Sequence, residues 1–571
     1  MRALKYFLCL LFLGGIVAVV TIFWESQKKI KAPKVSADKS ISVAETQTAA
    51  SPYSGKNQQL SEDLVRCNSA IIISEIDHEL PYDYDVQKSN DTVILKAKTQ
   101  KTSHWLIEQY ISYLSETDDC INAAHLPPSF IDFENDPFGN FDFIYREPHF
   151  SPNLEHKLHS FSGANSVEEY WDVWGHNLFR NLRNHGLGRN IFMNNNPNQI
   201  CFSKPALLDN TTEYLKRRAG NSSGYDRLNT RRFVIMPLDD MTACVCSNCV
   251  KLGNTYQYAT PAVLNFMDRL ADRFPNYTFF TAAYHSTAKP PKQPPKHRID
   301  GVLVSACDLP KGVALDPENV FVKEFLETTG EWKKYTDTLF VWDYAANYND
   351  FFTPLPILYA LKKNLKFYRD CGITGVFLQG SSYDYSPFDD VKTFAATALM
   401  INGRLDVDML CRRYFARFYP VSANILADYY LSLEKAMEQG ITEQGPTPYN
   451  LHGNLGNAIK SYFCVDDFLA FYQNLELLLT DEIIGDYEKK RLEKLYTALS
   501  FTRLQIAFYL QTGSHDIANT LGKTVTITPE IEAAFKQLSK YRNYGLKNYM
   551  EKDGDLKKYL DYWGNSLLRN R

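Results

Sequence analysis

Short apolar runs alternate with helical patterns through the middle of the chain, from about residue 131 to residue 405. Alternation of this kind is typical of a parallel sheet covered by helices. Seven or eight such units close most economically as a (β/α)8 TIM-like barrel, which we expect here, with an open doubly wound sheet as the alternative. The predicted strands cover residues 141–146, 190–193, 233–236, 277–284, 301–306, 338–342 and 373–380, and the helices between them cover 209–218, 260–274, 356–370 and 387–401.

The pattern differs on both sides of this barrel. Residues 58–130 combine strand-like runs at 70–73 and 92–97 with a helical stripe at 103–114 that Ser103 is expected to cap, so they predict a small α+β domain. From residue 406 to 571 apolar positions recur only at helical spacing, and this part predicts an all-α domain.

The N-terminus carries the most apolar stretch of the chain. The run from Tyr6 to Trp24 follows Arg2 and Lys5, and a span of about 20 apolar residues is what a bilayer-crossing helix needs. An uncleaved signal-anchor is expected, with a cleaved export signal as the alternative. Residues 1–57 are then anchor and linker, and the protein is expected outside the cytoplasm, in the periplasm or on the cell surface, held to the membrane.

Charge and composition narrow the class of partner. The net charge is −4 and no basic stripe is visible, which argues against nucleic acid. The chain has 36 Tyr and 7 Trp, and such rings stack on sugar faces while their OH and NH groups bond hydroxyls. Most of these rings are expected to be core residues, but the aromatic content is compatible with a sugar partner such as an oligosaccharide or a glycoprotein glycan, and no cofactor is expected.

Carboxyl groups lie at the ends of predicted strands, where barrel enzymes keep their chemistry. Glycoside hydrolysis needs two carboxyl groups, or one acid and a second carboxylate that orients a 2-acetamido group acting as nucleophile. The adjacent Asp239 and Asp240 are expected to share these catalytic roles; the alternative is that one of them only caps a loop. The other expected acids are Glu147, Asp308 and Asp343.

Three cysteines follow the aspartates, in the pattern Cys244-x-Cys246-x-x-Cys249. A structural zinc site uses four ligands, and no second pair stands at zinc-finger spacing. A disulfide that shapes the loop is therefore favoured over a metal, and no metal site is assigned.

Five segments together resemble the family of the domain of unknown function 4838 (DUF4838), which is related to glycoside hydrolase family 163 and common in exported proteins of Bacteroidota. The segments are PLDDMTACVCSNC at 237–249, AAYHSTAKPPKQPP at 282–295, VWDYAANYNDFFTPLPIL at 341–358, FYRDCGITGVFLQG at 367–380 and DVDMLCRRYFARFYP at 406–420.

The resemblance covers roughly residues 130–420 and implies a glycoside hydrolase barrel similar to endo-β-N-acetylglucosaminidases. The upstream α+β unit resembles the small domain that precedes the barrel in β-hexosaminidases and α-glucuronidases. With the strand-end acids and the aromatic segments, the expected glycan-binding residues are Arg146, Glu147, His176, Tyr284, Asp308, Trp342, Asp343, Tyr344 and Gln379.

One position departs from the family pattern: Leu378 stands where a glutamate often precedes Gln-Gly. If that glutamate is the general acid, the chain is inactive or uses another acid such as Asp384. A glycan-binding barrel without activity is therefore one alternative. The other is an α-glucuronidase-like hydrolase, with Arg146 facing the carboxylate of a uronic acid.

Overall fold

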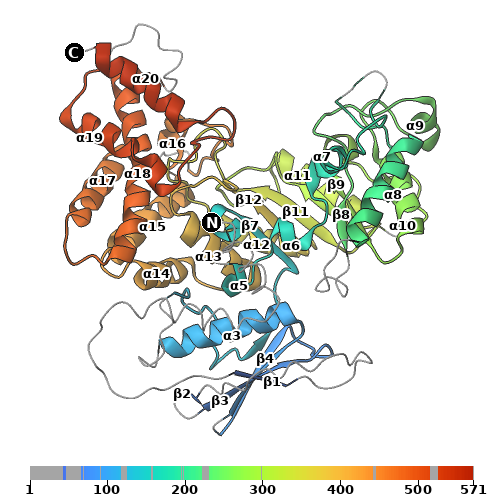
Figure 1. Cartoon of the computed structure of the whole chain (residues 1–571), viewed down its shortest axis with the longest axis horizontal. Helices are drawn as coiled ribbons and strands as arrows, with labels where there is room; N and C mark the ends of the chain where they lie inside the picture. Colours follow the sequence, from blue (N-terminus) through green and yellow to red (C-terminus); the bar gives the residue numbers. More distant parts are fainter. Residues whose placement is uncertain are drawn as a thin grey trace, which may run out of the picture.

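A computed structural model shows three regions in chain order: an N-terminal sheet with one long helix, a central parallel sheet covered by helices, and a C-terminal helical region (Figure 1). The predicted membrane segment lies outside the described residues. Within them, no helix combines the length and the apolar character needed to cross a bilayer. The structure describes residues 43–46, 66–67, 70–90, 92–116, 125–155, 159–193, 196, 198–220, 231–297, 299–440, 445–514 and 525–569.

The N-terminal sheet has the order β1-β3-β5-β4-β6, with β2 beside β3. Helix α3 (Gln100–Ser115) lies between this sheet and the central region (Figure 1). The expected cap at Ser103 is wrong, because Thr99 accepts the Thr102 N–H and starts the helix earlier. Ser103 instead bonds Ser74 in the core. The strands are β1 (Val43–Thr46), β2 (Arg66–Cys67), β3 (Ala70–Ile76), β4 (Tyr84–Ser89), β5 (Thr92–Ala97) and β6 (Phe138–Gly139).

The central sheet is entirely parallel, in the order β7-β12-β11-β10-β9-β8. Beyond β8, Val173 adds a single parallel bridge to Phe233. The weak strand expected at 190–193 is only one bridge, Phe192 to Ile200. In the described chain the sheet is therefore a curled half-barrel rather than a complete eight-stranded barrel. Its strands are β7 (Tyr145–His149), β8 (Arg232–Val234), β9 (Thr278–Ala283), β10 (Gly301–Ser305), β11 (Leu339–Tyr344) and β12 (Gly375–Gln379).

Aromatic side chains fill the inside of this curl. Tyr145, on edge strand β7, stacks on Phe340 of β11 with ring centroids 5.2 Å apart, and Trp171 meets Phe280 of β9 at 4.9 Å. Strand β12 lies between β7 and β11, and the Tyr145 and Phe340 rings meet across its residue Gly375. Gly375 makes room for the stack, since a Cβ there would lie 2.5 Å from the Phe340 ring.

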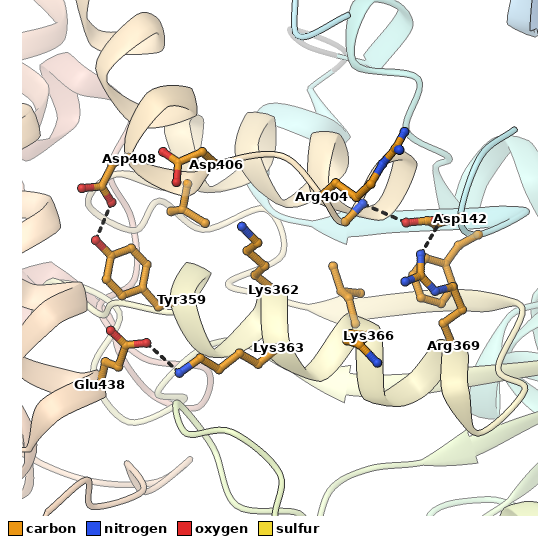
Figure 2. A pocket seen from close by; sticks show the side chains of 14 residues that line it. Asp142, Tyr359, Lys362, Lys363, Lys366, Arg369, Arg404, Asp406, Asp408 and Glu438 are labelled. Atoms are coloured by element: carbon orange, nitrogen blue, oxygen red, sulfur yellow. Dashed lines mark hydrogen bonds and ion pairs between the residues drawn. The ribbon is translucent and has the colours of Figure 1, made fainter. Parts of the chain in front are cut away.

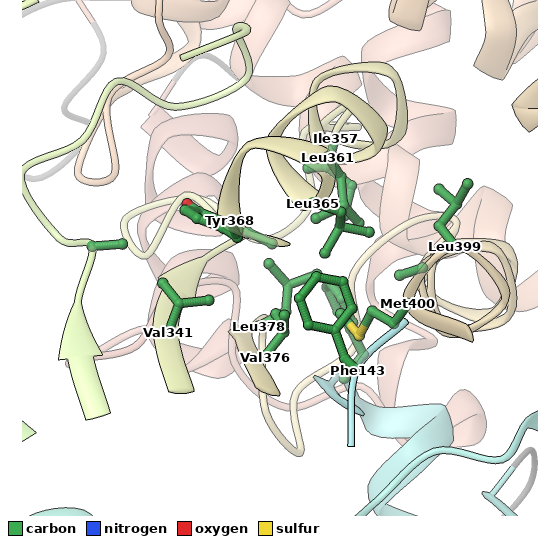
Figure 3. Close-up of a cluster of buried hydrophobic side chains, with 14 of the residues drawn as sticks. Phe143, Val341, Ile357, Leu361, Leu365, Tyr368, Val376, Leu378, Leu399 and Met400 are labelled. Carbon is green, nitrogen blue, oxygen red and sulfur yellow. The ribbon is translucent and has the colours of Figure 1, made fainter. Parts of the chain in front are cut away.

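The outer face of the central sheet packs on helices. Figure 3 shows Val341, Val376 and Leu378 among side chains of α12 (Leu358–Asp370) and α13 (Asp389–Ile401). Leu378 is 2% exposed. Position 378 thus faces the helical layer, and a glutamate there would point away from the inside of the curl. The departure from the family pattern does not remove an acid from the interior.

The remaining helices around the central sheet are mostly short. They are α4 (Ser151–Leu154), α5 (His159–Ser162), α6 (Val167–Tyr170), α7 (Leu178–Asn184), α8 (Pro205–Gly220), α9 (Ser247–Leu252), α10 (Thr260–Arg273) and α11 (Val320–Trp332).

The C-terminal region is helical, as expected. It docks on the loop after β11, where Tyr348 N–H donates to Leu451 O and Glu551 N–H donates to Tyr348 O, at 2.7 and 2.8 Å. This docking brings a distant part of the chain to the ends of the central strands. The helices are α14 (Val407–Phe418), α15 (Ala423–Gln439), α16 (Leu455–Ser461), α17 (Val465–Leu479), α18 (Asp486–Thr512), α19 (Pro529–Leu538) and α20 (Leu556–Arg569).

Candidate active site

A cavity of about 370 Å³ lies at the carboxyl ends of strands β8 to β12 and is bounded on one side by the C-terminal region. We call it the mouth pocket. Parallel α/β sheets bind ligands at this end of their strands, because loops of several units converge there. The lining residues are His176, Met236, Asp239, Ala282, Tyr284, Leu303, Ser305, Cys307, Trp342, Tyr344, Tyr348, Gln379, Leu451, His452, Glu551 and Lys552.

One wall of the mouth pocket is an indole held in place from two sides. Trp342 donates its Nε1–H to Gln379 Oε1 at 2.7 Å, and Trp174 stacks on its ring at 5.0 Å. The hydrogen bond joins two neighbouring strands, since β11 and β12 are paired. A fixed aromatic face beside polar groups is the surface on which a sugar ring stacks.

Asp239 enters the pocket from the loop after β8. Its side chain is 69% exposed, and its Oδ1 accepts a hydrogen bond from the Tyr284 hydroxyl at 3.1 Å. Burial and the neighbouring Asp239 charge raise the pKa of Tyr284. The phenol therefore stays protonated at neutral pH and remains a donor.

Asp240 has a different environment from its neighbour. Its Oδ1 accepts the Thr242 N–H at 2.7 Å, and Asn196 Nδ2 lies 3.4 Å from Oδ2. The hydrogen bonds from Thr242 lower the pKa of this carboxyl. Asp240 is not part of the pocket lining. Its hydrogen bonds are those of a side chain that caps its own loop.

The aspartate loop is fixed by two side chains behind it. Gln199, which is buried, accepts the Leu238 N–H at 3.0 Å and donates to Leu238 O and Asp240 O at 3.2 and 3.3 Å. His176 Nδ1 lies 2.6 Å from Pro237 O and donates its N–H to this carbonyl. Of these two, only His176 was expected. Nothing in the sequence around Gln199 marks it.

The C-terminal region supplies the other charged groups of the pocket, Glu551 and Lys552, together with His452. The sequence analysis found none of them, because they follow the last predicted strand by a long helical stretch that reads as core. Only the docking of residues 549–551 on the loop after β11 reveals the contribution.

Three expected residues lie elsewhere. Asp343 faces outward from β11, buried against Lys311 Nζ at 2.6 Å and the Tyr368 hydroxyl at 2.7 Å. The Arg146 guanidinium is buried on the Gly163 and Phe143 carbonyls, and burial lowers its pKa to about 10. Asp308 is exposed outside the lining. With Arg146 so occupied, nothing supports an α-glucuronidase-like pocket.

Glu147 lies deeper, on the inner face of β7. It is fully buried; Oε1 is 3.0 Å from His149 Nδ1, and Oε2 has no hydrogen-bond partner. Burial, and then the Glu168 charge, raise the pKa of Glu147 well above its usual value. Burial lowers the pKa of His149 to about 4. Both shifts favour the neutral forms of the two side chains, and Glu147 is not part of the lining of the mouth pocket.

A larger cavity, of about 640 Å³, lies on the outside of the fold between α12, α14 and the loop at 403–408. Figure 2 shows that its charged side chains face one another. Lys363 pairs with Glu438 at 2.7 Å, and Arg369 pairs with Asp142 at 2.6 Å. Four of its charges are thus already paired with one another, and it lies away from the carboxyl ends of the strands. The mouth pocket is the better candidate.

Among the described residues, one group has the composition of a metal site: Cys201, Cys244, Cys246 and Cys249. The expected disulfide in this loop is not formed in the structure, where these thiols are free.

Comparison with known proteins gives one family and several solved structures. Residues 152–432 match the model described as domain of unknown function (DUF4838). No curated protein matches the sequence.

The similar structures are glycoside hydrolases. CpGH89 from Clostridium perfringens, bound to its substrate GlcNAc-α-1,4-galactose, has a TM-score of 0.46 at 10% identity over 76% of this chain and 59% of its own. The same family 89 enzyme with PUGNAc gives 0.44 at 10% over 82% and 62%. A GH138 enzyme targeting pectin rhamnogalacturonan II gives 0.37 at 8% over 92% and 98%. With TM-scores below 0.5, these similarities say nothing about the substrate of this chain.

Proposed function

We propose that this chain, a member of the DUF4838 family through residues 152–432, is a glycoside hydrolase that cleaves glycans containing N-acetylhexosamine in the mouth pocket. The observation that carries the proposal is the Asp239–Tyr284 hydrogen bond beside the fixed Trp342 indole, at the carboxyl ends of parallel strands. A carboxylate, a phenol and an aromatic face together match the groups of one acetylated sugar.

The sugar ring stacks on Trp342, with Tyr344 and Gln379 near its edge. Stacking buries the apolar C–H face of the ring, and the neighbouring polar groups bond hydroxyls. Ser305 and His176 from the lining add further hydrogen-bonding groups. The aromatic wall is therefore proposed to bind the sugar, and the carboxyl groups to catalyse cleavage of the glycosidic bond.

Asp239 acts on the 2-acetamido group. Its carboxylate accepts the amide N–H, which pushes electron density to the amide oxygen as that oxygen attacks C1 and displaces the leaving group. Tyr284 orients the carboxylate through the hydrogen bond at 3.1 Å. Water then attacks C1, the ring closed by the acetamido group reopens, and the configuration at C1 is retained.

The departing oxygen needs a proton, and Glu551 is the other carboxyl group of the lining. In the free chain it is exposed. Substrate that fills the pocket removes water around it, and this favours the neutral acid. Glu551 then protonates the leaving oxygen in the first step and takes a proton from the attacking water in the second.

The test is glycan release from an N-glycoprotein by the full chain, beside Asp239→Asn and Glu551→Gln. Each substitution keeps size and removes the carboxylate, so kcat is expected to fall at least about 100-fold. Glu438→Gln, in the larger outer cavity, is the matched control and should stay within about twofold. Release that survives both pocket substitutions contradicts the proposal.

A second function, glycan binding without hydrolysis, is favoured by one observation. A general acid is commonly buried so that it keeps its proton, whereas Glu551, the proposed acid, is exposed. Titration calorimetry with an N-acetylglucosamine oligosaccharide separates the two functions. Binding that Trp342→Ala abolishes, with no release from any glycan, favours the binding protein.

The proposed place of action is outside the cytoplasm, at the membrane. The apolar run from Tyr6 to Trp24 supports it. Fractionation of cells that produce the full chain tests it: recovery in the soluble cytoplasmic fraction contradicts this location.

A further inference from the structure

We propose that Cys201, Cys244, Cys246 and Cys249 bind one structural Zn²⁺ ion that fixes the loop carrying Asp239. The four Sγ atoms lie within 4.8 Å of one another. We call them the cysteine cluster. The inference is independent of what the mouth pocket does, because it rests on the thiols alone.

The spacing of the sulfur atoms fits a tetrahedral metal and not a disulfide. Cys201 Sγ lies 3.8 Å from the Sγ atoms of both Cys246 and Cys249. A disulfide needs about 2.05 Å. With a zinc–sulfur bond of about 2.3 Å, the edge of a regular tetrahedron is about 3.8 Å. Two of the sulfur–sulfur distances thus equal this edge, and all of them are within 4.8 Å.

The surroundings of the cysteine cluster suit bound thiolates. Cys201, Cys244 and Cys249 are buried and Cys246 is half-buried. The Ser203 hydroxyl accepts the Cys249 S–H at 3.1 Å and lies 3.3 Å from Cys246 Sγ, to which its own O–H can donate and stabilise negative charge. Four sulfur ligands leave no open position for substrate, which makes the site structural rather than catalytic. Soft thiolates select zinc over magnesium or calcium.

The ligands come from two segments that the ion would join. Cys201 precedes α8, 45 residues before Cys246, while the other three surround the start of α9. The first segment also carries Gln199, whose side chain holds Leu238 and Asp240 by three hydrogen bonds. The metal would therefore fix the segment whose Gln199 side chain holds the loop that carries Asp239.

The distance along the chain explains why the sequence pattern missed the site. Zinc-finger spacing requires a second pair of ligands, whereas Cys201 is a single cysteine far upstream of the other three. Only the fold brings it to the other three.

The test is the metal content of the purified full chain, by mass spectrometry, as isolated and after removal of metal and return of Zn²⁺. About one zinc per chain is expected, and Co²⁺ in its place should show the thiolate charge-transfer and d–d bands of a tetrahedral site. Cys201→Ser should weaken zinc binding at least about tenfold. Cys371→Ser, a partly buried cysteine outside the cysteine cluster, is the matched control and should bind like the parent.

Three results would overturn the proposal. They are a chain that binds no zinc with its thiols reduced, thiol counting that shows a disulfide among the four cysteines, and unchanged zinc affinity in Cys201→Ser. If Cys201→Ser does not fold, Co²⁺ spectra of the parent decide alone, since a site with fewer than four thiolates has weaker charge-transfer bands.

Discussion

Residues that are adjacent in the sequence can have different surroundings in this protein, because the backbone points their side chains in different directions. Asp239 faces the mouth pocket and bonds Tyr284, whereas Asp240 caps its own loop through Thr242. On β11, Trp342 faces inward and Asp343 faces outward to Lys311. Because side chains alternate along a strand, a pocket that contains Trp342 and Tyr344 cannot also contain Asp343.

The alternation along the strand separates residues that the sequence pattern groups together. The aromatic residues at 342 and 344 and the acid at 343 were all assigned to one glycan site. The turn at 237–242 was not predictable in the same way, because hydrogen bonds from Gln199, Asn196 and Thr242 decide which aspartate is free. Two of these partners precede the loop by about 40 residues.

The buried His149 predicts a pH dependence of stability. Its folded pKa is about 4 against 6.5 for the free side chain, so between these values the unfolded chain binds the extra proton. Stability from this group is complete above pH 6.5 and is lost as the pH falls through 4. The loss amounts to about 3 kcal/mol.

Urea unfolding of the parent and of His149→Gln, from pH 7 to pH 4, measures this loss of stability. Glu147 and Glu168, the acidic neighbours of His149, are present in both proteins, so the difference isolates the imidazole. The parent should lose more stability than the variant on acidification. Equal slopes would show that His149 titrates normally in the folded chain.

At the scale of elements, the inner face of the central sheet depends on where side chains are small. Gly375 on β12 lies against Phe340 and Tyr145, and Gly301 on β10 lies against Phe280. These glycines let the rings reach the centre of the curl.

The apolar runs predicted most of the strands, yet they did not predict β4, whose sequence Tyr-Asp-Val-Gln-Lys-Ser is largely polar. Pairing with β5 and β6 decides that strand.

Gly375→Ala is expected to destabilise the fold by about 1–3 kcal/mol, because the new Cβ would overlap the Phe340 ring and crowd the Tyr145 Cβ at 2.8 Å. Gly330→Ala is the matched control. Gly330 lies within α11 with nothing near its missing Cβ, and alanine should stabilise the helix by up to about 1 kcal/mol. Thermal unfolding of both variants checks the opposite signs. Unchanged stability in Gly375→Ala would mean that the aromatic interior rearranges around the new methyl group at little cost in free energy.

At the scale of the whole molecule, the helical C-terminal region is part of both the core and the pocket. One cluster of buried apolar residues runs from the N-terminal sheet to α18. A second joins the loop after β11 to α18, α19 and α20. The sequence predicted the helices but assigned them to a separate domain with only core aromatics. The contribution of the C-terminal region to the mouth pocket depends on contacts with the distant loop after β11, which local sequence patterns do not encode.

Shared cores predict cooperative unfolding of the central and C-terminal regions. Phe501 of α18 packs on Phe352 of the loop after β11, with ring centroids 5.6 Å apart. Phe501→Ala should therefore cost about 3–5 kcal/mol and shift the whole calorimetric transition. A shift of only one of two separate heat-absorption peaks would show that the C-terminal helices unfold alone.

The measurement that bears most directly on the proposed function compares Asp239→Asn with Asp240→Asn in release of N-acetylglucosamine-containing glycans. Each change removes one negative charge, and the two residues are adjacent. Asparagine at 240 can still accept the Thr242 N–H. The mouth-pocket geometry predicts at least about a 100-fold lower kcat for Asp239→Asn and activity within about twofold of the parent for Asp240→Asn. Equal loss in both variants, or loss only in Asp240→Asn, would contradict the assignment of the chemistry to Asp239.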